Sequence, residues 1–142
     1  MHESILNNES VLSFLLRVVL GILFFFQGYD KVFKVKIRGV GNYFQQELGS
    51  IKVPVFFIHF SAWFTSLAEL ICGALLVLGL FKTYALYILG VDLILVAGAF
   101  SLIKPLWDMQ HFFPRLILLS VLLCLPAKWD LLSADYLLYI YL

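Results

Sequence analysis

The chain has 142 residues, of which 63% are hydrophobic and 13% are charged, and its formal net charge is +1. Soluble domains are about half apolar, so this composition indicates an integral membrane protein rather than a soluble one. The near-neutral charge argues against nucleic acid as a partner, because phosphate recognition needs a concentrated basic face.

Four hydrophobic segments follow one another along the chain, and each is long enough to cross a bilayer, which takes about 20 mainly apolar residues. The predicted spans cover about residues 11–33, 55–80, 84–103 and 109–125. They leave no room for a soluble domain. We therefore predict an all-α fold in which residues 1–142 form a single transmembrane domain, an integral membrane four-helix bundle.

Two shorter segments lie outside the predicted spans. In the loop of residues 34–54, Gly39 and Gly41 precede the stretch "NYFQQELG". There Asn42 is predicted to cap a short interfacial helix that ends at Gly49. Residues 131–142 are apolar but too short to span, so we expect them to lie in the interface or against the bundle.

Basic residues near the span ends differ in number between the two faces of the predicted bundle. The face that holds the 34–54 loop carries Lys31, Lys34, Lys36, Arg38, Lys52 and Lys104. The face that holds the N-terminus carries Lys82 and Lys128. The positive-inside rule then predicts that the loop is cytoplasmic and that both termini are outside.

Each predicted span contains one charged residue well inside its apolar run. The four are Arg17, Glu69, Asp92 and Arg115. Counting from the N-terminal face at 1.5 Å per residue, their depths overlap between roughly 9 and 18 Å. Isolated charges at such depths are costly, so we expect them to pair in the bundle interior, with Arg17 facing Glu69 or Asp92. The set is either a neutralised packing network or a site that binds or relays a ligand.

A second polar layer is predicted nearer the loop face. It consists of Gln27, Lys31, His59, Trp63 and His111. Such a layer could hydrogen-bond the carbonyls of a quinone while apolar helix faces hold its ring and tail. The histidines are more simply explained as interfacial or core hydrogen-bonding residues than as ligands. Cys72 and Cys124 form no CxxC pair, so the sequence predicts no metal site and shows no cofactor motif.

Several stretches together resemble the DoxX family. They are "LLRVVLGILFFFQGYDK", "FQQELG" followed by Pro54, "LAELICGALLVLGLFKTYA" and "PAKWDLL". The resemblance covers residues from about Leu12 to Leu132, and the positions that match the family pattern are Arg17, Gly21, Gly28, Lys31, Glu69, Gly73 and Gly79. Arg115 departs from it, since family members commonly have an acidic or neutral polar residue near there. The resemblance implies a four-helix protein of the bacterial cytoplasmic membrane. Some members are linked to membrane oxidoreductase complexes, including a thiosulfate to quinone system.

The leading hypothesis is a membrane subunit or accessory protein of a quinone-linked or thiol-linked oxidoreductase. We expect it not to be catalytic alone, because the chain has no motif for a centre that moves electrons. Its expected partners are the lipid bilayer, other membrane subunits or a second copy of the chain. The alternatives are a non-enzymatic membrane scaffold or assembly factor and, third, a small transporter or lipid-binding protein.

Overall fold

The computed structural model describes residues 7–47, 53–103 and 109–141, and all regular structure in these ranges is helical. In chain order the α-helices are α1 (Asn8–Tyr29), α2 (Ile37–Glu47), α3 (Val55–Leu78), α4 (Lys82–Ile103), α5 (Met109–Cys124) and α6 (Ala134–Tyr141). A π-helical turn, Asp30–Lys34, follows α1, and a short 3-10 helix, Ala127–Trp129, follows α5. The predicted all-α class is confirmed.

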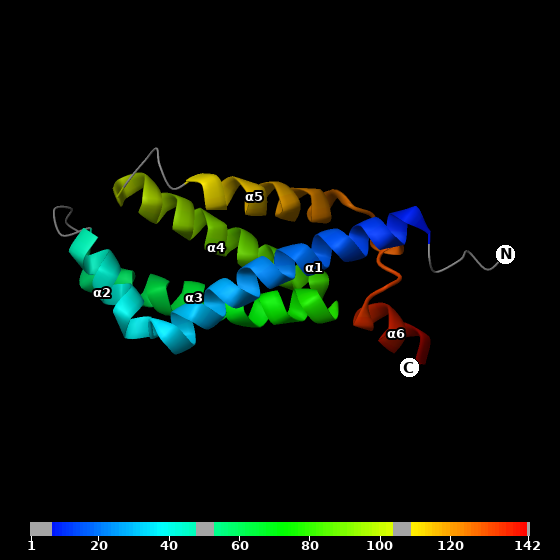
Figure 1. Ribbon diagram of the computed structural model, residues 1–142, viewed down its shortest axis with the longest axis horizontal. Coiled ribbons are helices and arrows are strands. Elements are labelled where there is room, and N and C mark those ends of the chain that lie inside the picture. Colours follow the sequence, from blue (N-terminus) through cyan, green and yellow to red (C-terminus); the bar gives the residue numbers. More distant parts are fainter. Residues whose placement is uncertain (1–6, 48–52, 104–108, 142) are drawn as a thin grey trace.

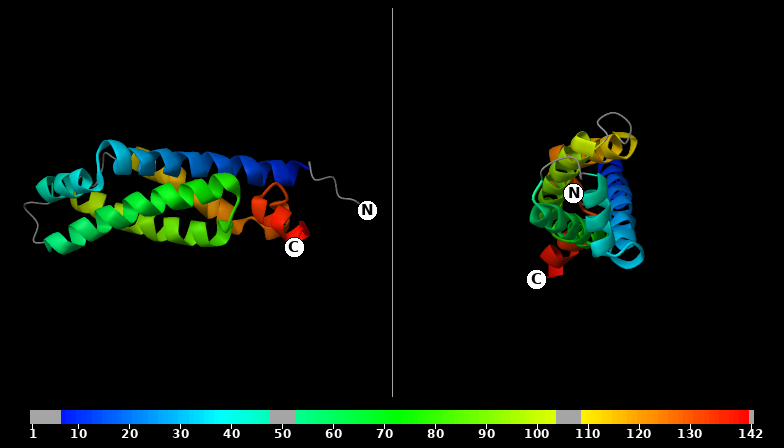
Figure 2. Two further views of the ribbon diagram at one scale, coloured as in Figure 1. Left: turned by 90° about the horizontal axis from the view of Figure 1, so that it is seen from below. Right: turned by 90° about the vertical axis from the view of Figure 1, so that its left-hand side faces the viewer.

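The long helices run beside one another and give the molecule an elongated shape (Figures 1 and 2). Three of them are long and apolar enough to cross a membrane by length and composition: α1 extended by the π turn, α3 and α4. The fourth predicted span contains a shorter apolar helix, Phe112–Cys124. Helix α2 lies at the end of the molecule away from both chain termini (Figure 1).

Helices α1 and α3 pack very closely because glycine replaces side chains along their contact. A Cβ built on Gly21 would lie 2.9 Å from Val77, and one on Gly73 would lie 2.5 Å from the backbone nitrogen of Phe25. A Cβ on Gly28 would meet the backbone of Leu70. Small residues of this kind let two membrane helices approach until their backbones touch. The contact determines which face of α1 is buried in the protein.

Helix α2 begins earlier than the sequence predicted. It starts at Ile37, and Asn42 lies inside it rather than at its N-cap. The chain reverses before the helix, where Lys36 adopts a left-handed backbone with φ of 62°. Gly41 lies inside α2 at the contact with α3, where a Cβ would collide with the imidazole of His59. The predicted helix end at Gly49 falls outside the described residues.

A tight turn joins α3 to α4. Gly79 ends α3 in the left-handed conformation, with φ of 75°, and its N–H donates to the carbonyl of Leu75 at 2.8 Å. Glycine accepts this conformation without the strain that a Cβ would add. Helix α4 then starts at Lys82, two residues before the predicted span. The first turn of α6 docks on this corner, since Asp135 N donates to the Gly79 carbonyl at 3.0 Å.

Apolar side chains from α1, α3, α4 and α5 form the core. Its members are Leu20, Phe24, Cys72, Leu76, Ala85, Leu86, Leu89, Leu93, Leu119 and Leu122. Many large apolar side chains on the outer faces are exposed, as expected for helices that meet lipid. The core therefore occupies the middle and terminal end of the molecule, and the space near α2 is filled less completely.

Candidate functional site: a cavity above buried charges

A cavity of about 330 Å³ opens between α1, α2, α3 and α4 near the α2 end. Its lining is Gln27, Lys31, Phe44, Val53, Phe57, Ile58, Ser61, Ala62, Thr65, Ile94, Leu95, Val96, Gly98, Ala99, Phe100 and Leu102. The walls are mainly apolar, with few polar groups. This size and character are those of a small-molecule pocket rather than a packing defect.

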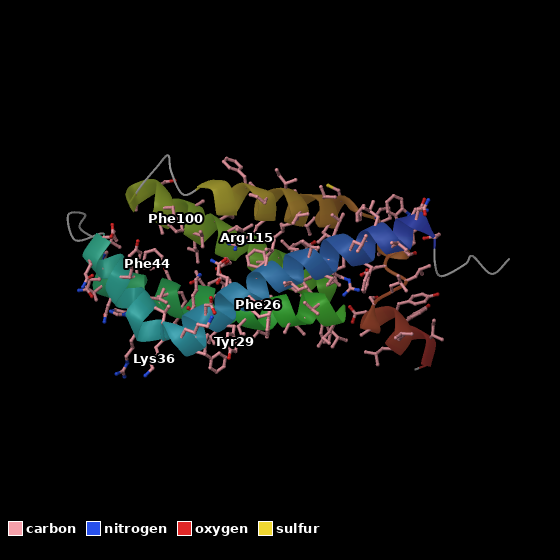
Figure 3. All side chains as sticks on the ribbon, in the orientation of Figure 1. Phe26, Tyr29, Lys36, Phe44, Phe100 and Arg115 are labelled. Carbon is pink, nitrogen blue, oxygen red and sulfur yellow. The ribbon has the colours of Figure 1, made fainter. Side chains whose placement is uncertain are left out.

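Two phenylalanines form part of the cavity wall. Phe44 on α2 and Phe100 on α4 are labelled in Figure 3, and their ring centroids lie 6.4 Å apart at an interplanar angle of 70°. This edge-to-face arrangement is a favourable one for two aromatic rings. Rim residues such as Phe57, Ile94 and Leu102 are more than half exposed, so the cavity is continuous with the outer surface of the bundle.

Gln27 and Lys31 bring polar groups into the cavity from the end of α1 and the π turn. The Oε1 atom of Gln27 is buried and has no hydrogen-bond partner among the described residues. Lys31 Nζ donates to Glu69 Oε1 at 2.8 Å and lies 2.8 Å from Oε2. A π turn shifts helical phase relative to an α-helix and often occurs at functional sites. The sequence carried no signal that predicted it.

Glu69 and Asp92 lie one turn beyond the cavity lining. Thr65 and Val96 line the cavity; Glu69 follows Thr65 by four residues on α3, and Asp92 precedes Val96 by four residues on α4. Residues spaced by four share a helix face. The Glu69 side chain is 1% exposed, and Asp92 is 0% exposed. Neither carboxyl oxygen of Asp92 has a hydrogen-bond partner in the described part of the chain.

Arg115 completes this level from α5. Its guanidinium carbon lies 5.5 Å from the ring centroid of Phe24 on α1, a cation–π distance, and Figure 3 shows the side chain directed into the bundle. Its Nε has no hydrogen-bond partner, and within the described residues no carboxylate comes within 4.0 Å of it. Glu69 and Asp92 are the carboxylates whose charge acts on it. Glu69, Asp92 and Arg115 thus lie in the same part of the interior, and Arg115 forms no ion pair with either carboxylate within the described residues.

Arg17 does not join that level, which corrects the predicted pairing with Glu69 or Asp92. It donates at 2.6 Å from Nη1 to the Leu76 carbonyl and at 2.6 Å from Nη2 to the Leu132 carbonyl. Its Nε lies 3.4 Å from Asp130 Oδ1. The cation lies at the carbonyl end of α3, where the helix dipole favours positive charge. Arg17 lies close to the terminal end of the protein, where residues 130–132 can contact it.

Asp130 has further partners at the terminal end. Ser13 Oγ donates to Asp130 Oδ1 at 3.2 Å, and Lys82 Nζ lies 3.5 Å from Oδ2. We call Arg17, Asp130, Ser13 and Lys82 the C-terminal clamp. The sequence does not single out Asp130 as a partner of Arg17, because Asp130 follows the last predicted span, in the stretch "PAKWDLL". The signal in the sequence is that Asp130 and Arg17 both lie near the predicted membrane face that holds the N-terminus.

The predicted second polar layer is brought together only in part. Gln27 and Lys31 line the cavity, whereas His59 packs against Gly41 of α2 and Trp63 is 53% exposed on the outer face of α3. Trp63 neighbours the buried Ala62, and one residue turns a helix by about 100°, which carries its side chain out of the interior. The side chain of His111 lies outside the described ones.

The chain matches the model of one protein family. No curated protein and no solved structure matches the chain. The family model of DoxX matches residues 12–104, which is more than half of the chain and includes the cavity and the Lys31 to Glu69 ion pair. With its three apolar helices long enough to cross a membrane, the chain is a small membrane protein that belongs to the DoxX family.

Proposed function

We propose that this protein is a small membrane subunit or accessory protein of a quinone-linked or thiol-linked oxidoreductase system, and that its cavity binds a quinone headgroup. The observation that carries the proposal is the apolar cavity of about 330 Å³ with Gln27 and Lys31 in its wall. A quinone combines a flat apolar ring with two carbonyl acceptors. The Lys31 ammonium and the Gln27 amide can donate to those acceptors, and the phenylalanines can stack on the ring.

The exposed rim supports a hydrophobic ligand that arrives from the bilayer. Phe57, Ile94 and Leu102 surround the opening, so a molecule dissolved in lipid can reach the cavity without passing through water. The chain's sequence contains no motif for a flavin, metal or disulfide centre. Electrons would therefore come from a partner subunit or from a cofactor bound by it.

The same proposal includes a placement in the bilayer. Helices α1, α3, α4 and α5 cross the bacterial cytoplasmic membrane as a four-helix bundle, and α2 lies at the cytoplasmic interface. Lys34, Lys36 and Arg38 are exposed at the α2 end. At the terminal end Lys128 is exposed, whereas Lys82 is nine-tenths buried beside Asp130. The freely exposed positive charge is thus concentrated near α2, which supports a cytoplasmic α2 and termini outside.

Photoaffinity labelling in lipid nanodiscs tests the site. A photoreactive short-chain quinone should label residues 53–65 and 94–102, and excess unlabelled quinone should protect them. A photoreactive hydrocarbon of similar size, which lacks carbonyls, is the control and should label outward positions such as Tyr87 without protection. Quinone labelling that matches the hydrocarbon pattern, or that resists competition, would leave the scaffold alternative as the better account.

A further inference from the structure

The carboxyl group of Asp92 is buried in the protein interior without a hydrogen-bond partner among the described residues. It is fully buried in α4, and both of its oxygens lack hydrogen-bond partners within the described residues. An ionised carboxylate in this condition loses its hydration and gains no hydrogen bond in return. A neutral carboxylic acid avoids most of that cost.

The neighbouring charged groups do not compensate for the cost of burying an ionised Asp92 carboxylate. The groups that face Asp92 from the packed helices are Lys31, Glu69, Cys72 and Arg115. Lys31 is already bound to Glu69 at 2.8 Å, and Arg115 makes no contact with Asp92 within 4.0 Å. Glu69 is itself negative, and its repulsion of a second negative charge opposes the attraction of the two cations.

A route connects this carboxyl pair to the cavity. Lys31 both lines the cavity and hydrogen-bonds Glu69, while Thr65 and Val96 lie one helical turn above Glu69 and Asp92 on their own helices. The pair therefore lies directly beneath the cavity floor. A water molecule in the cavity would lie about one helical turn from both carboxyls.

We propose that Glu69 and Asp92 form an intramembrane proton-binding site, in which Asp92 holds one proton that exchanges with water through the cavity on the α2 side. Uptake forms one O–H bond at an Asp92 carboxyl oxygen, release breaks it, and no electron moves. Lys31 keeps Glu69 ionised by direct contact, so the two carboxyls have different states. The site needs no quinone and goes beyond the function proposed above.

Infrared spectroscopy of the protein in nanodiscs tests the proposal. The difference spectrum between the parent and Asp92→Asn should contain the carbonyl stretch of one protonated carboxylic acid, and in D₂O this band should shift to lower frequency. The matched control is Asp30→Asn, which changes an exposed ion pair with Lys34 and should produce no such band. A parent-minus-Asp92→Asn spectrum without the band, or a band that never shifts in D₂O, would overturn the proposal.

Thermal unfolding supplies a second readout that does not depend on the spectra. Asparagine has the shape of a protonated aspartate, so Asp92→Asn should keep the unfolding temperature within about 2 °C of the parent. Glu69→Gln removes the ionised partner of Lys31 and should lower it by several degrees. Equal losses in the two variants would mean that both carboxyls are ionised, which contradicts the proposal.

Discussion

Lys31 Nζ lies 2.8 Å from both carboxyl oxygens of Glu69, whose side chain is 1% exposed, so a cation from the π turn after α1 neutralises an anion in the middle of α3. The contact joins the cavity wall to the buried charges below it. A buried pair of this kind adds little stability compared with an apolar replacement, but removing one member leaves a costly charge behind. Its place beside the cavity supports the binding role proposed above for Lys31.

Breaking this pair from one side should be far more damaging than replacing both sides. We expect Lys31→Met to lower the free energy of unfolding by about 3–5 kcal/mol, because Glu69 stays buried without its partner. The double variant Lys31→Met with Glu69→Met should regain most of that loss. Thermal unfolding in detergent measures all three proteins.

The ion pair between Lys34 and Asp30 provides the control for this experiment. Its side chains are 68% and 51% exposed, and exposed pairs contribute little. Lys34→Met should leave the unfolding temperature unchanged. If Lys34→Met were as harmful as Lys31→Met, burial of the Lys31 pair would not be the reason for its importance.

The C-terminal clamp should hold residues 130–135 against the bundle. Replacing Arg17 by Leu removes two 2.6 Å bonds from a charged donor, worth roughly 3–6 kcal/mol together. Arg17→Lys should rescue little, because one ammonium lacks the planar fork that reaches both carbonyls. Limited proteolysis should show earlier cleavage near Leu132 in both variants, with Arg38→Leu on exposed α2 as control. Unchanged cleavage in Arg17→Leu would show that the clamp does not anchor this segment.

Close packing of α1 on α3 should be sensitive to a single methyl group. Gly73→Ala places a Cβ 2.5 Å from Phe25 N and 3.0 Å from Gly21 O, both backbone atoms that cannot move aside, so we expect a clear loss of stability. Gly90→Ala on α4 meets nothing within 4 Å and should be neutral or stabilising by about 0.5–1 kcal/mol. Unfolding temperatures of the two variants compare them directly. Similar effects would contradict the packing seen between α1 and α3.

The proposed orientation in the membrane predicts different reagent access at the two ends. In a background where Cys72 and Cys124 are replaced by Ala, Lys36→Cys should react with a membrane-impermeant maleimide only after cells are opened. Lys128→Cys should react in cells whose outer barrier alone is permeabilised. The reverse pattern would place α2 outside the cytoplasm.

Hydropathy was sufficient to predict the α-helical class and the positions of the long helices, because burial in lipid imposes length and composition on each segment. Helical spacing places Ala62, Ser66 and Glu69 on one face of α3, and all three are buried. It did not predict that Trp63 points outward or that a π turn aims Lys31 at Glu69. Those features depend on how neighbouring helices pack, which a single-helix pattern does not contain.

The partner of Arg17 shows the same limit in another way. Counting depths suggested that Arg17 and Glu69 overlap, yet the side chain reaches the carbonyl end of α3 and Asp130 instead. Long side chains in membranes turn their charge toward the nearer end of the helix, where more polar partners are found. Depth estimated from the backbone position alone therefore does not give the position of the guanidinium.

Equilibrium binding of a short-chain ubiquinone analogue to a cavity-filling variant tests the central claim most directly. Ala99→Phe fills the cavity without changing a charge, and Ser120→Phe adds the same ring on the exposed side of α5. We predict that Ala99→Phe weakens binding at least about tenfold, or roughly 1.4 kcal/mol, and that Ser120→Phe binds like the parent. Unaltered binding in Ala99→Phe, or no binding to the parent, would contradict a quinone site between α1, α2, α3 and α4.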